Sequence, residues 1–237
     1  MNDRVYVHPT EARRRFVELS DSNFGNGDLA RGALLVALEE YPHLDVDAAL
    51  RSLDGIAERA LARGGKNDPA SFKLGYLQTE FFDTEGFRGN ITDYYDVRNS
   101  MLNEVIERKT GIPITLSIAF MHVAQRMGLK VSGIGLPGHY IVQVQIDLST
   151  VYIDPFQIGV TLSMSDIDKL LYAITDGKRR LQKEFLRAWS ARETLMRVLA
   201  NLEGAWMRVG ATEKAASAHE RVEILAGIEL DQKVGSL

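Results

Sequence analysis

The sequence predicts an α+β fold, in which N-terminal helices and one buried central helix pack on a small antiparallel sheet. Three observations lead to this prediction. Apolar residues recur at helical spacing through most of residues 29–127, segments rich in β-branched residues follow over 131–153, and helical spacing returns from residue 165. The chain has 237 residues, enough for one large domain or for one domain with an appendage.

The first part of the chain reads as three helices. Leucines at helical spacing indicate a helix over 29–41, which Pro42 ends. Asp45 is a suitable N-cap for the next helix, and Gly64-Gly65 stops it. A third helix is predicted over 69–81, because proline suits a first helical position.

The centre of the fold is predicted from residue 113 onward. Residues 83–98 are rich in glycine and aspartate and read as irregular. A short helix over 101–109 follows, with Ser100 as its cap and Gly111 as its terminator. The helix over 113–127 is apolar on nearly every side, and such a helix is buried.

Three strands and a helical tail complete the prediction. The strand segments are 131–136, 140–146 and 151–153, and a polar turn at 147–150 joins the last two as a hairpin. Helix is then predicted from 165 through to about residue 227. No linker rich in Pro, Gly or Ser divides the chain, so the boundary between any two domains near 185–190 is soft.

Composition excludes several classes of function. The chain has no cysteine, which removes disulfides, thiolate metal sites and cysteine nucleophiles together. A net charge of −4 argues against nucleic-acid binding, and the basic run Lys178-Arg179-Arg180 reads as a solvated helix face. The histidines show no ligand spacing, so we expect no metal.

We also expect neither a membrane span nor a secretory signal. No stretch reaches the ~18 uncharged apolar residues that a membrane span needs. The N-terminus, Met1-Asn2-Asp3-Arg4-Val5-Tyr6, lacks an apolar region followed by a cleavage site. We therefore expect a cytoplasmic protein that does not contact a membrane.

One motif matches a known fingerprint but lacks the structural context that the fingerprint requires. Residues 133–138 match G-x-G-x-x-G, the dinucleotide-binding fingerprint. That motif requires a helix N-terminus after it to receive the pyrophosphate, whereas a predicted strand follows here. We therefore reject a nucleotide site and expect no cofactor.

Three polar residues occupy positions at which protein folds commonly place catalytic groups. Thr115 lies in the first turn of the buried helix, His139 opens a strand after Pro137-Gly138, and Asp154 closes the next strand. A helix N-terminus offers positive potential and two neighbouring strands offer rigid support, an arrangement suited to a nucleophile, a base and an orienting acid.

At these residues the sequence resembles the SirB-type bacterial proteins of the transglutaminase-like superfamily, which join this core to a tetratricopeptide-like tail. The resemblance lies in blocks that follow the family's order over roughly residues 28–225. The blocks are Tyr94-Tyr95-Asp96-Val97-Arg98-Asn99-Ser100, Leu102-Asn103-Glu104-Val105, Arg108, Gly111-Ile112-Pro113-Ile114-Thr115-Leu116, Gly133-Ile134-Gly135-Leu136-Pro137-Gly138-His139 and Ile153-Asp154-Pro155-Phe156.

The resemblance implies a transglutaminase/papain-like core with a Cys–His–Asp triad. Its histidine and aspartate carry over onto His139 and Asp154. Its cysteine position falls near Thr115, with Ser117 as the alternative, and neither residue is a cysteine. A hydroxyl ionises far less readily than a thiol and needs a well-placed base, although hydroxyl triads do exist.

Sequence spacing argues against a complete triad. If the hairpin turns at 147–150, Asp154 lies opposite residue 142 or 143. His139 is then about 10 Å further along its strand, at ~3.3 Å per residue. A bulge, strong coiling or another register is required to bring the two side chains together.

Structural interpretations stand beside the catalytic ones. His139 is also read as a structural or surface histidine, Asp154 as a turn-forming aspartate, and Thr115 as an ordinary hydroxyl at a helix start. Asn103 and Glu104 are read either as lining the same cleft or as a helix cap and an ion-pairing residue.

The C-terminal part resembles one tetratricopeptide unit, so we expect two domains, a transglutaminase-like domain over 1–188 and a helical tail over 189–237. Trp206 marks the first helix of the unit, Gly210 its turn and Ala215 its second helix. A single unit cannot bury its apolar face alone. The tail therefore either completes the core or presents a groove to a partner peptide.

Two functions from different classes follow. The first is a non-catalytic, transglutaminase-like pseudoenzyme that acts through contacts with an unidentified protein or peptide, or simply stabilises that partner. The second is a hydrolase or amidase that uses a hydroxyl, with Thr115 or Ser117 as nucleophile, His139 as base and Asp154 as orienter.

Overall fold

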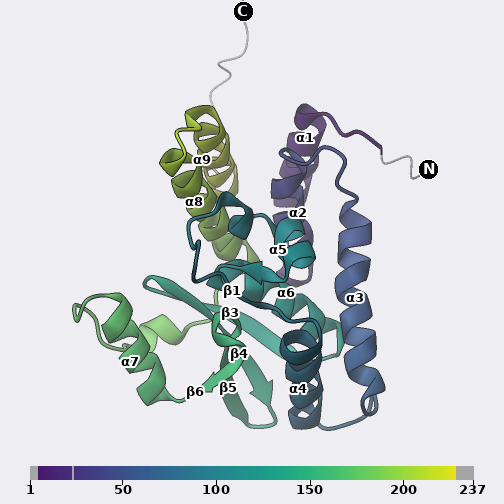
Figure 1. Ribbon diagram of the computed structural model, residues 1–237, viewed down its shortest axis with the longest axis vertical. Helices are drawn as coiled ribbons and strands as arrows, with labels where there is room; N and C mark the ends of the chain where they lie inside the picture. The colour runs from purple at the N-terminus through teal and green to yellow at the C-terminus, as the bar shows by residue number, and fades with distance from the viewer. Residues whose placement is uncertain (1–4, 23, 228–237) are drawn as a thin grey trace, which may run out of the picture.

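The computed structural model describes residues 5–22 and 24–227, and these residues form a mixed helical and sheet structure. Its main sheet has four antiparallel strands in the order β3-β4-β5-β6. Helices α1, α2, α3 and α6 lie to one side of this sheet, and α8 and α9 form a hairpin at the top of the view (Figure 1). The predicted α+β class is confirmed.

The N-terminal helices are α1 (Pro9–Asp21), α2 (Leu29–Leu38), α3 (Val46–Ala62) and α4 (Ala70–Gln78), with a short 3-10 turn, η1 (Asn26–Asp28), before α2 and a π-helical turn, η2 (Thr79–Thr84), after α4. The carboxylate of Asp45 caps α3 as predicted, because it accepts the backbone N–H of Ala48 at 2.8 Å. Sequence reasoning missed α1. Only Ala12, Phe16 and Ser20 of this helix are buried, one residue per turn, so its apolar stripe is narrow.

Between β1 (Arg88–Gly89) and β2 (Thr110–Gly111) the chain forms η3 (Val97–Ser100) and α5 (Leu102–Arg108). The two short strands pair in parallel, Gly89 opposite Gly111. The predicted boundaries of α5 were wrong. Met101 is its N-cap, and Lys109 ends it in the left-handed conformation with φ 57°, which leaves Gly111 free to pair in β2.

The central helix is α6 (Pro113–Arg126), and it is buried along nearly its whole length. It packs against β3 (Lys130–Leu136) and β4 (His139–Ile146), and β5 (Ser149–Asp154) and β6 (Val160–Leu162) extend the sheet. The last two strands are joined by the 3-10 turn η4 (Pro155–Gln157). The predicted burial of this helix and its packing on an antiparallel sheet are confirmed.

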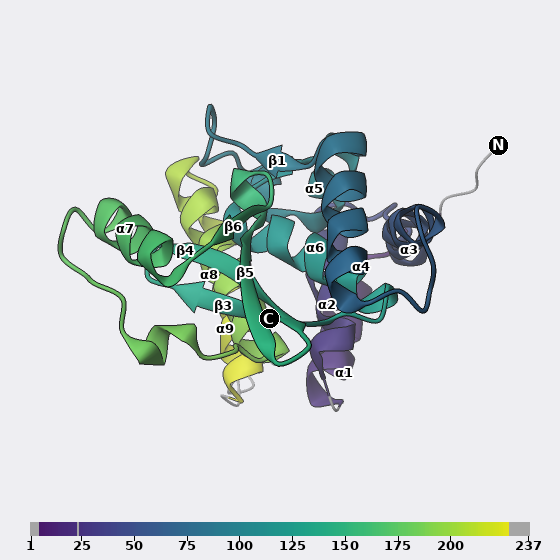
Figure 2. The ribbon, with the colours of Figure 1, turned by 90° about the horizontal axis from the view of Figure 1, so that it is seen from below.

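The two faces of the sheet have different neighbours. Tyr140, Val142 and Val144 of β4 belong to the main core with α6. Ile141 of β4 and Tyr152 of β5 belong to a second cluster with Leu171 of α7 (Met164–Ile174). Figure 2 shows α7 on the side of the sheet away from α3 and α6. Successive residues of a strand point to opposite faces, so alternation assigns each residue to one cluster.

The C-terminal helices are separated from α7 by non-helical chain. Residues 175–190 contain only the short 3-10 turn η5 (Lys183–Leu186), so the prediction of helix from 165 through to 227 was wrong there. Then α8 (Ala191–Arg208) and α9 (Thr212–Ala226) form a hairpin. Leu199 and Leu202 of α8 and Leu225 of α9 belong to the main core cluster, together with residues of α2 and α6. Within residues 5–22 and 24–227, no helix combines the length and apolarity that crossing a membrane requires.

Candidate functional site

His139 and Asp154 are brought together at the ends of neighbouring strands. The imidazole Nε2 lies 2.8 Å from Oδ2 of Asp154, and the two side chains are 8% and 0% exposed as residues. The register explains the contact. Val142 pairs with Ile153, so Asp154 lies opposite Ile141, and His139 is its diagonal neighbour on the same face.

The expected gap of 10 Å was wrong because the hairpin turn is shorter than predicted. Ile146 pairs with Ser149, so only Asp147 and Leu148 form the turn, with Asp147 at φ 50°. A turn shorter by two residues shifts the register by two. That shift brings the carboxylate within reach of the imidazole without a bulge.

The carboxylate of Asp154 is also a structural cap. Its Oδ1 accepts the backbone N–H of Phe156 at 3.0 Å and lies 3.4 Å from the backbone N of Gln157. Its Oδ2 accepts the side-chain amide of Gln157 at 3.0 Å in addition to the imidazole contact. The turn-forming and imidazole-orienting interpretations of Asp154 therefore describe the same carboxylate.

Thr115 lies in the first turn of α6, and its hydroxyl is committed to backbone. The hydroxyl donates to the carbonyl of Asn99 at 2.7 Å and lies 3.2 Å from the carbonyl of Ile112. The residue is 0% exposed. Its proton thus points toward carbonyl oxygens, and no hydrogen bond to His139 is present among the described residues.

Ser117, the alternative nucleophile position, is also 0% exposed. Its Oγ is buried without a hydrogen-bond partner in the part of the chain that the structure describes. An unpaired buried hydroxyl costs stability, and it has no base beside it that would activate it.

The hydrogen bonds of the three residues form two separate sets. By strand alternation His139 and Asp154 continue the face of Ile141 and Tyr152, which packs under α7. Thr115 belongs to α6, which packs on the opposite face and also contacts η4 beside Asp154. The described hydrogen bonds join the histidine to the aspartate, whereas those of the Thr115 hydroxyl go to backbone carbonyls.

A series of close contacts nevertheless connects the two parts. A Cβ on Gly111 would stand 2.9 Å from Oγ1 of Thr115, and a Cβ on Gly89 would stand 2.5 Å from the ring of Phe156. The Phe156 ring lies edge-on to the His139 ring, with centroids 6.0 Å apart. Because Gly89 pairs with Gly111, only glycine allows α6, β1 and η4 to approach this closely.

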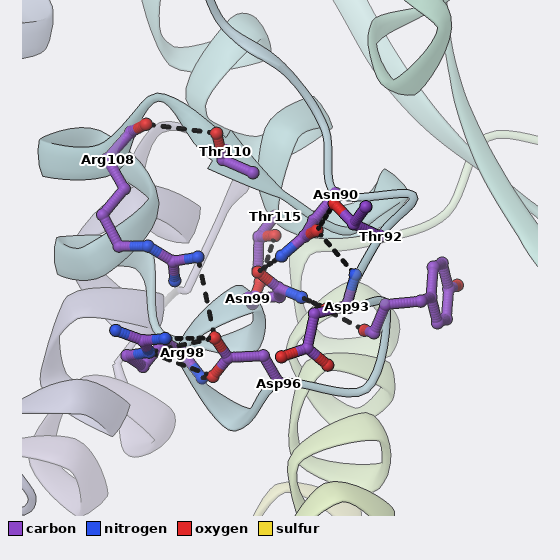
Figure 3. A network of polar contacts seen from close by, with 10 residues as sticks. Asn90, Thr92, Asp93, Asp96, Arg98, Asn99, Arg108, Thr110 and Thr115 are labelled. Atoms are coloured by element: carbon purple, nitrogen blue, oxygen red, sulfur yellow. Dashed lines mark hydrogen bonds and ion pairs between the residues drawn. The ribbon is translucent and has the colours of Figure 1, made fainter.

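Two asparagines that sequence reasoning missed form the centre of a buried polar network (Figure 3). The amide of Asn90 donates to Oδ1 of Asn99 at 3.1 Å. The amide of Asn99 donates to the carbonyls of Asp93 at 2.7 Å and Tyr94 at 3.1 Å, and Oδ1 of Asn90 accepts the backbone N–H of Asp93. The only signal in the sequence was that Asn99 lies inside a block that carries the family resemblance.

The rim of this network holds an ion pair. The carboxylate of Asp96 accepts three contacts from the guanidinium of Arg98, and Arg108 lies 3.7 Å away. The hydrogen bonds from Arg98 lower the pKa of Asp96 below its ordinary value. The segment after β1 is therefore held both by neutral amides and by charge.

Two clefts lie elsewhere on the surface. One of 1220 Å³ runs between α1, α5 and the chain before α3, and Asn103 and Glu104 line it. The other, of 400 Å³, is lined by Asp54 and His122. Neither of these two clefts is lined by Thr115, His139 or Asp154. No group of three or more metal-binding side chains occurs among the residues described.

A family model described as the transglutaminase-like superfamily matches residues 47–200. The chain belongs to this superfamily. The matched region begins in α3, includes α6 and the sheet, and ends within α8, so it contains Thr115, His139 and Asp154. The resemblance inferred from the sequence is confirmed at the level of the superfamily.

Curated relatives come from bacteria and animals. The UPF0162 protein of Xylella fastidiosa (strain 9a5c) is 30% identical over 193 residues, which span 80% of this chain and 69% of the relative. The UPF0162 protein of Vibrio cholerae is 25% identical over 200 residues, 81% and 71% of the two chains. F-box only protein 21 of Mus musculus is 29% identical over 118 residues, 43% of this chain and 19% of that protein. No solved structure matches the chain significantly.

Proposed function

We propose that this transglutaminase-like protein is non-catalytic and acts through contacts with another protein. One observation carries the proposal. The hydroxyl of Thr115, near the position where the superfamily presents its cysteine, is buried and donates to the carbonyl of Asn99. With no cysteine in the chain, this leaves the pair of His139 and Asp154 without an attacking atom beside it.

The chemistry of nucleophilic catalysis supports this reading. A hydroxyl attacks only when a base within hydrogen-bond reach removes its proton. The proton of Thr115 points to backbone carbonyls, which cannot accept it in a reaction. The imidazole Nε2 contacts Asp154, which fixes the ring as a triad aspartate would, but among the described residues no hydroxyl donates to the other ring nitrogen, Nδ1.

Sequence related to part of this chain also occurs inside a much longer protein. The alignment with F-box only protein 21 covers 19% of that protein, whereas the alignment with the UPF0162 protein of Xylella fastidiosa covers 69% of its length. A related segment in proteins of such different length fits a role in binding. The identity of the partner stays open.

Turnover assays test the proposal. Purified protein and the variant His139→Ala are compared on a panel of p-nitrophenyl esters and peptide amides. General-base catalysis contributes ~10²–10⁴-fold, so any reaction that used the imidazole is visible against the variant. We expect equal, background rates, and a His139-dependent rate would refute the proposal.

The intact pair of His139 and Asp154 favours one alternative, a hydrolase or amidase with Thr115 or Ser117 as nucleophile. This alternative requires α6 to rearrange, because both hydroxyls are 0% exposed. Labelling with a serine-reactive phosphonate, followed by peptide mapping to residue 115 or 117, supports it. Protein that stays unlabelled at both positions removes it.

We also propose that α8 and α9 are a tetratricopeptide-like unit, as in the SirB-type proteins, and that this unit completes the core rather than offering a free groove. The packing of Leu199, Leu202 and Leu225 in the main cluster supports this. An ion pair between Arg221 of α9 and Glu39 after α2 adds to it. A chain truncated before α8 is expected to lose cooperative unfolding, and a truncated chain that unfolds cooperatively contradicts the proposal.

A further inference from the structure

The segment between β1 and η3 presents apolar side chains to solvent. All five residues of 91–95, here called the aromatic loop, are exposed. They include Ile91 at 82%, Tyr95 at 58% and Tyr94 at 37% exposure. The segment that follows β1 projects from the top of the molecule in Figure 2. Exposed large apolar side chains that gather on one loop are a common mark of a binding surface.

The base of the aromatic loop is held by buried hydrogen bonds. Asn90 and Asn99 are 8% and 0% exposed, and each amide has partners within the loop or across it. Buried amides are tolerated only when they are satisfied, and a satisfied network fixes one conformation. The loop is therefore presented in a single arrangement, which lowers the entropy lost when a partner binds.

Thr115 is the third anchor of this loop. Its hydroxyl donates to the backbone carbonyl of the same Asn99 whose side chain binds the carbonyls of Asp93 and Tyr94. Figure 3 shows Thr115 at the inner side of the network, next to Asn99. The side chain near the superfamily's nucleophile position thus helps to hold the exposed loop.

An arginine of α8 lies beside the aromatic loop. The guanidinium carbon of Arg208 lies 3.9 Å from the centre of the Tyr95 ring. Among the described residues, no hydrogen bond or ion pair engages this guanidinium.

A second stack of arginine on tyrosine provides the contrast. Arg180 lies 4.1 Å from the centre of the Tyr172 ring, but its guanidinium is also 2.9 Å from the carboxylate of Asp168. That positive charge is neutralised within the chain, whereas the described residues offer the guanidinium of Arg208 no carboxylate partner. Asp93 is the one carboxylate of residues 91–95.

We propose that the aromatic loop, together with Arg208, is a docking surface for an acidic segment of a partner protein that also carries large apolar side chains. The inference rests on the proposed function and specifies its partner. Tyrosine and arginine are among the residues that dominate binding energy in protein interfaces, and the unpaired guanidinium of Arg208 selects carboxylates over basic groups. The surface adjoins the vestigial site, because the Tyr94 and Phe156 rings lie 5.9 Å apart and Phe156 contacts His139.

The test uses two peptide series that differ only in charge. In each, a core of Leu and Phe is flanked by the same number of residues, either Glu or Lys, and binding to the full chain is followed by fluorescence polarisation. We expect the Glu series to bind at least ~10-fold more tightly than the Lys series, with a difference that shrinks at high salt. Equal binding of the two series, tighter binding of the Lys series, or no binding by either would overturn the inference.

Matched variants locate the surface. Tyr95→Ser and Arg208→Glu are each expected to weaken binding of the Glu series by at least ~10-fold, as hot-spot residues do. Tyr172→Ser, which removes the other arginine-stacked tyrosine, is expected to leave binding unchanged. If Tyr172→Ser weakens binding as much as Tyr95→Ser does, the surface is wrongly placed.

Variants of residue 115 distinguish a role in holding the aromatic loop from a general effect on folding. Thr115→Val removes the hydroxyl at constant shape and is expected to weaken binding several-fold, whereas Thr115→Ser keeps the hydrogen bond and the binding. Thermal unfolding of both variants confirms that they are folded. Failure of these peptide experiments leaves the non-catalytic proposal standing, because only a His139-dependent turnover removes that proposal.

Discussion

The molecule contains two pairs of histidine and aspartate that have nearly equal contact distances but different surroundings. His139 and Asp154 lie 2.8 Å apart with side chains 7% and 0% exposed. His122 and Asp54 lie 2.9 Å apart, but their side chains are 12% and 27% exposed. Asp154 also accepts backbone amides and a glutamine, whereas Asp54 shares the contacted oxygen with the guanidinium of Arg126.

The difference teaches that a histidine–aspartate contact marks a functional site only through its surroundings. The pair at 122 and 54 joins two helices at the edge of a cleft, and a neighbouring cation already neutralises its carboxylate. The pair at 139 and 154 is fixed by the end of the sheet and by η4, as an enzyme would require. Among the described residues, no hydroxyl makes a hydrogen bond to this pair.

The largest expected contrast is in stability. Asp154→Ala leaves three amide groups and an imidazole without their acceptor in a buried place, and we expect it to lower the free energy of unfolding by about 3 kcal/mol. Asp54→Ala removes a partly exposed pair and is expected to lower it by less than about 1 kcal/mol. Urea unfolding of both variants measures the contrast, and equal losses would mean that the two pairs are equivalent.

Thiol reactivity shows whether the pair of His139 and Asp154 activates a side chain at residue 115. Because the chain has no cysteine, Thr115→Cys introduces the only thiol. We expect iodoacetamide to modify it at least ~100-fold more slowly than the exposed control Ser149→Cys, since burial suppresses the thiolate. The rate should not change when His139→Ala is added. Rapid alkylation that depends on His139 would show an activated position at residue 115.

The smallest expected effect is the pH response of the second pair. Burial lowers the pKa of His122 below 6.5, and the bond to Asp54 offsets only part of that shift. The unfolded chain therefore binds the proton more readily, and stability falls as the pH drops from about 6.5 toward the folded pKa. An NMR titration of His122 measures this. Asp54→Asn should lower the pKa further, and a rise in that variant would contradict the assignment.

Much of the fold follows from local patterns. Pro113 and the apolar sequence after it predicted the start and burial of α6, and the β-branched segments predicted the strands. The predictions that failed depend on the conformation of a few residues. The register of β4 on β5 depends on whether the turn has two or four residues, and Asp147 takes a left-handed conformation that hydrophobic patterning does not indicate.

Of the polar residues in the site, the sequence predicted only those that lie in the blocks carrying the family resemblance. His139 and Asp154 were placed from the resemblance, and they do meet. The roles of Asn90 and Asn99 depend on contacts between a loop and a helix start, which no spacing in the sequence reports. The direction of the Thr115 hydroxyl is likewise a tertiary property. The sequence around a threonine in the first turn of a helix is the same whether its hydroxyl attacks a substrate or anchors a loop.

The central claim is that the hydroxyl of Thr115 holds the aromatic loop and does not serve as a nucleophile. Hydrogen exchange of the Asp93 and Asp96 amides tests it most directly, because both amides donate within the loop that Asn99 anchors. We predict that Thr115→Val accelerates their exchange by about tenfold, corresponding to the loss of one hydrogen bond of ~1.4 kcal/mol, and that Thr115→Ser leaves it unchanged. Exchange in Thr115→Val as slow as in the parent protein would contradict the account.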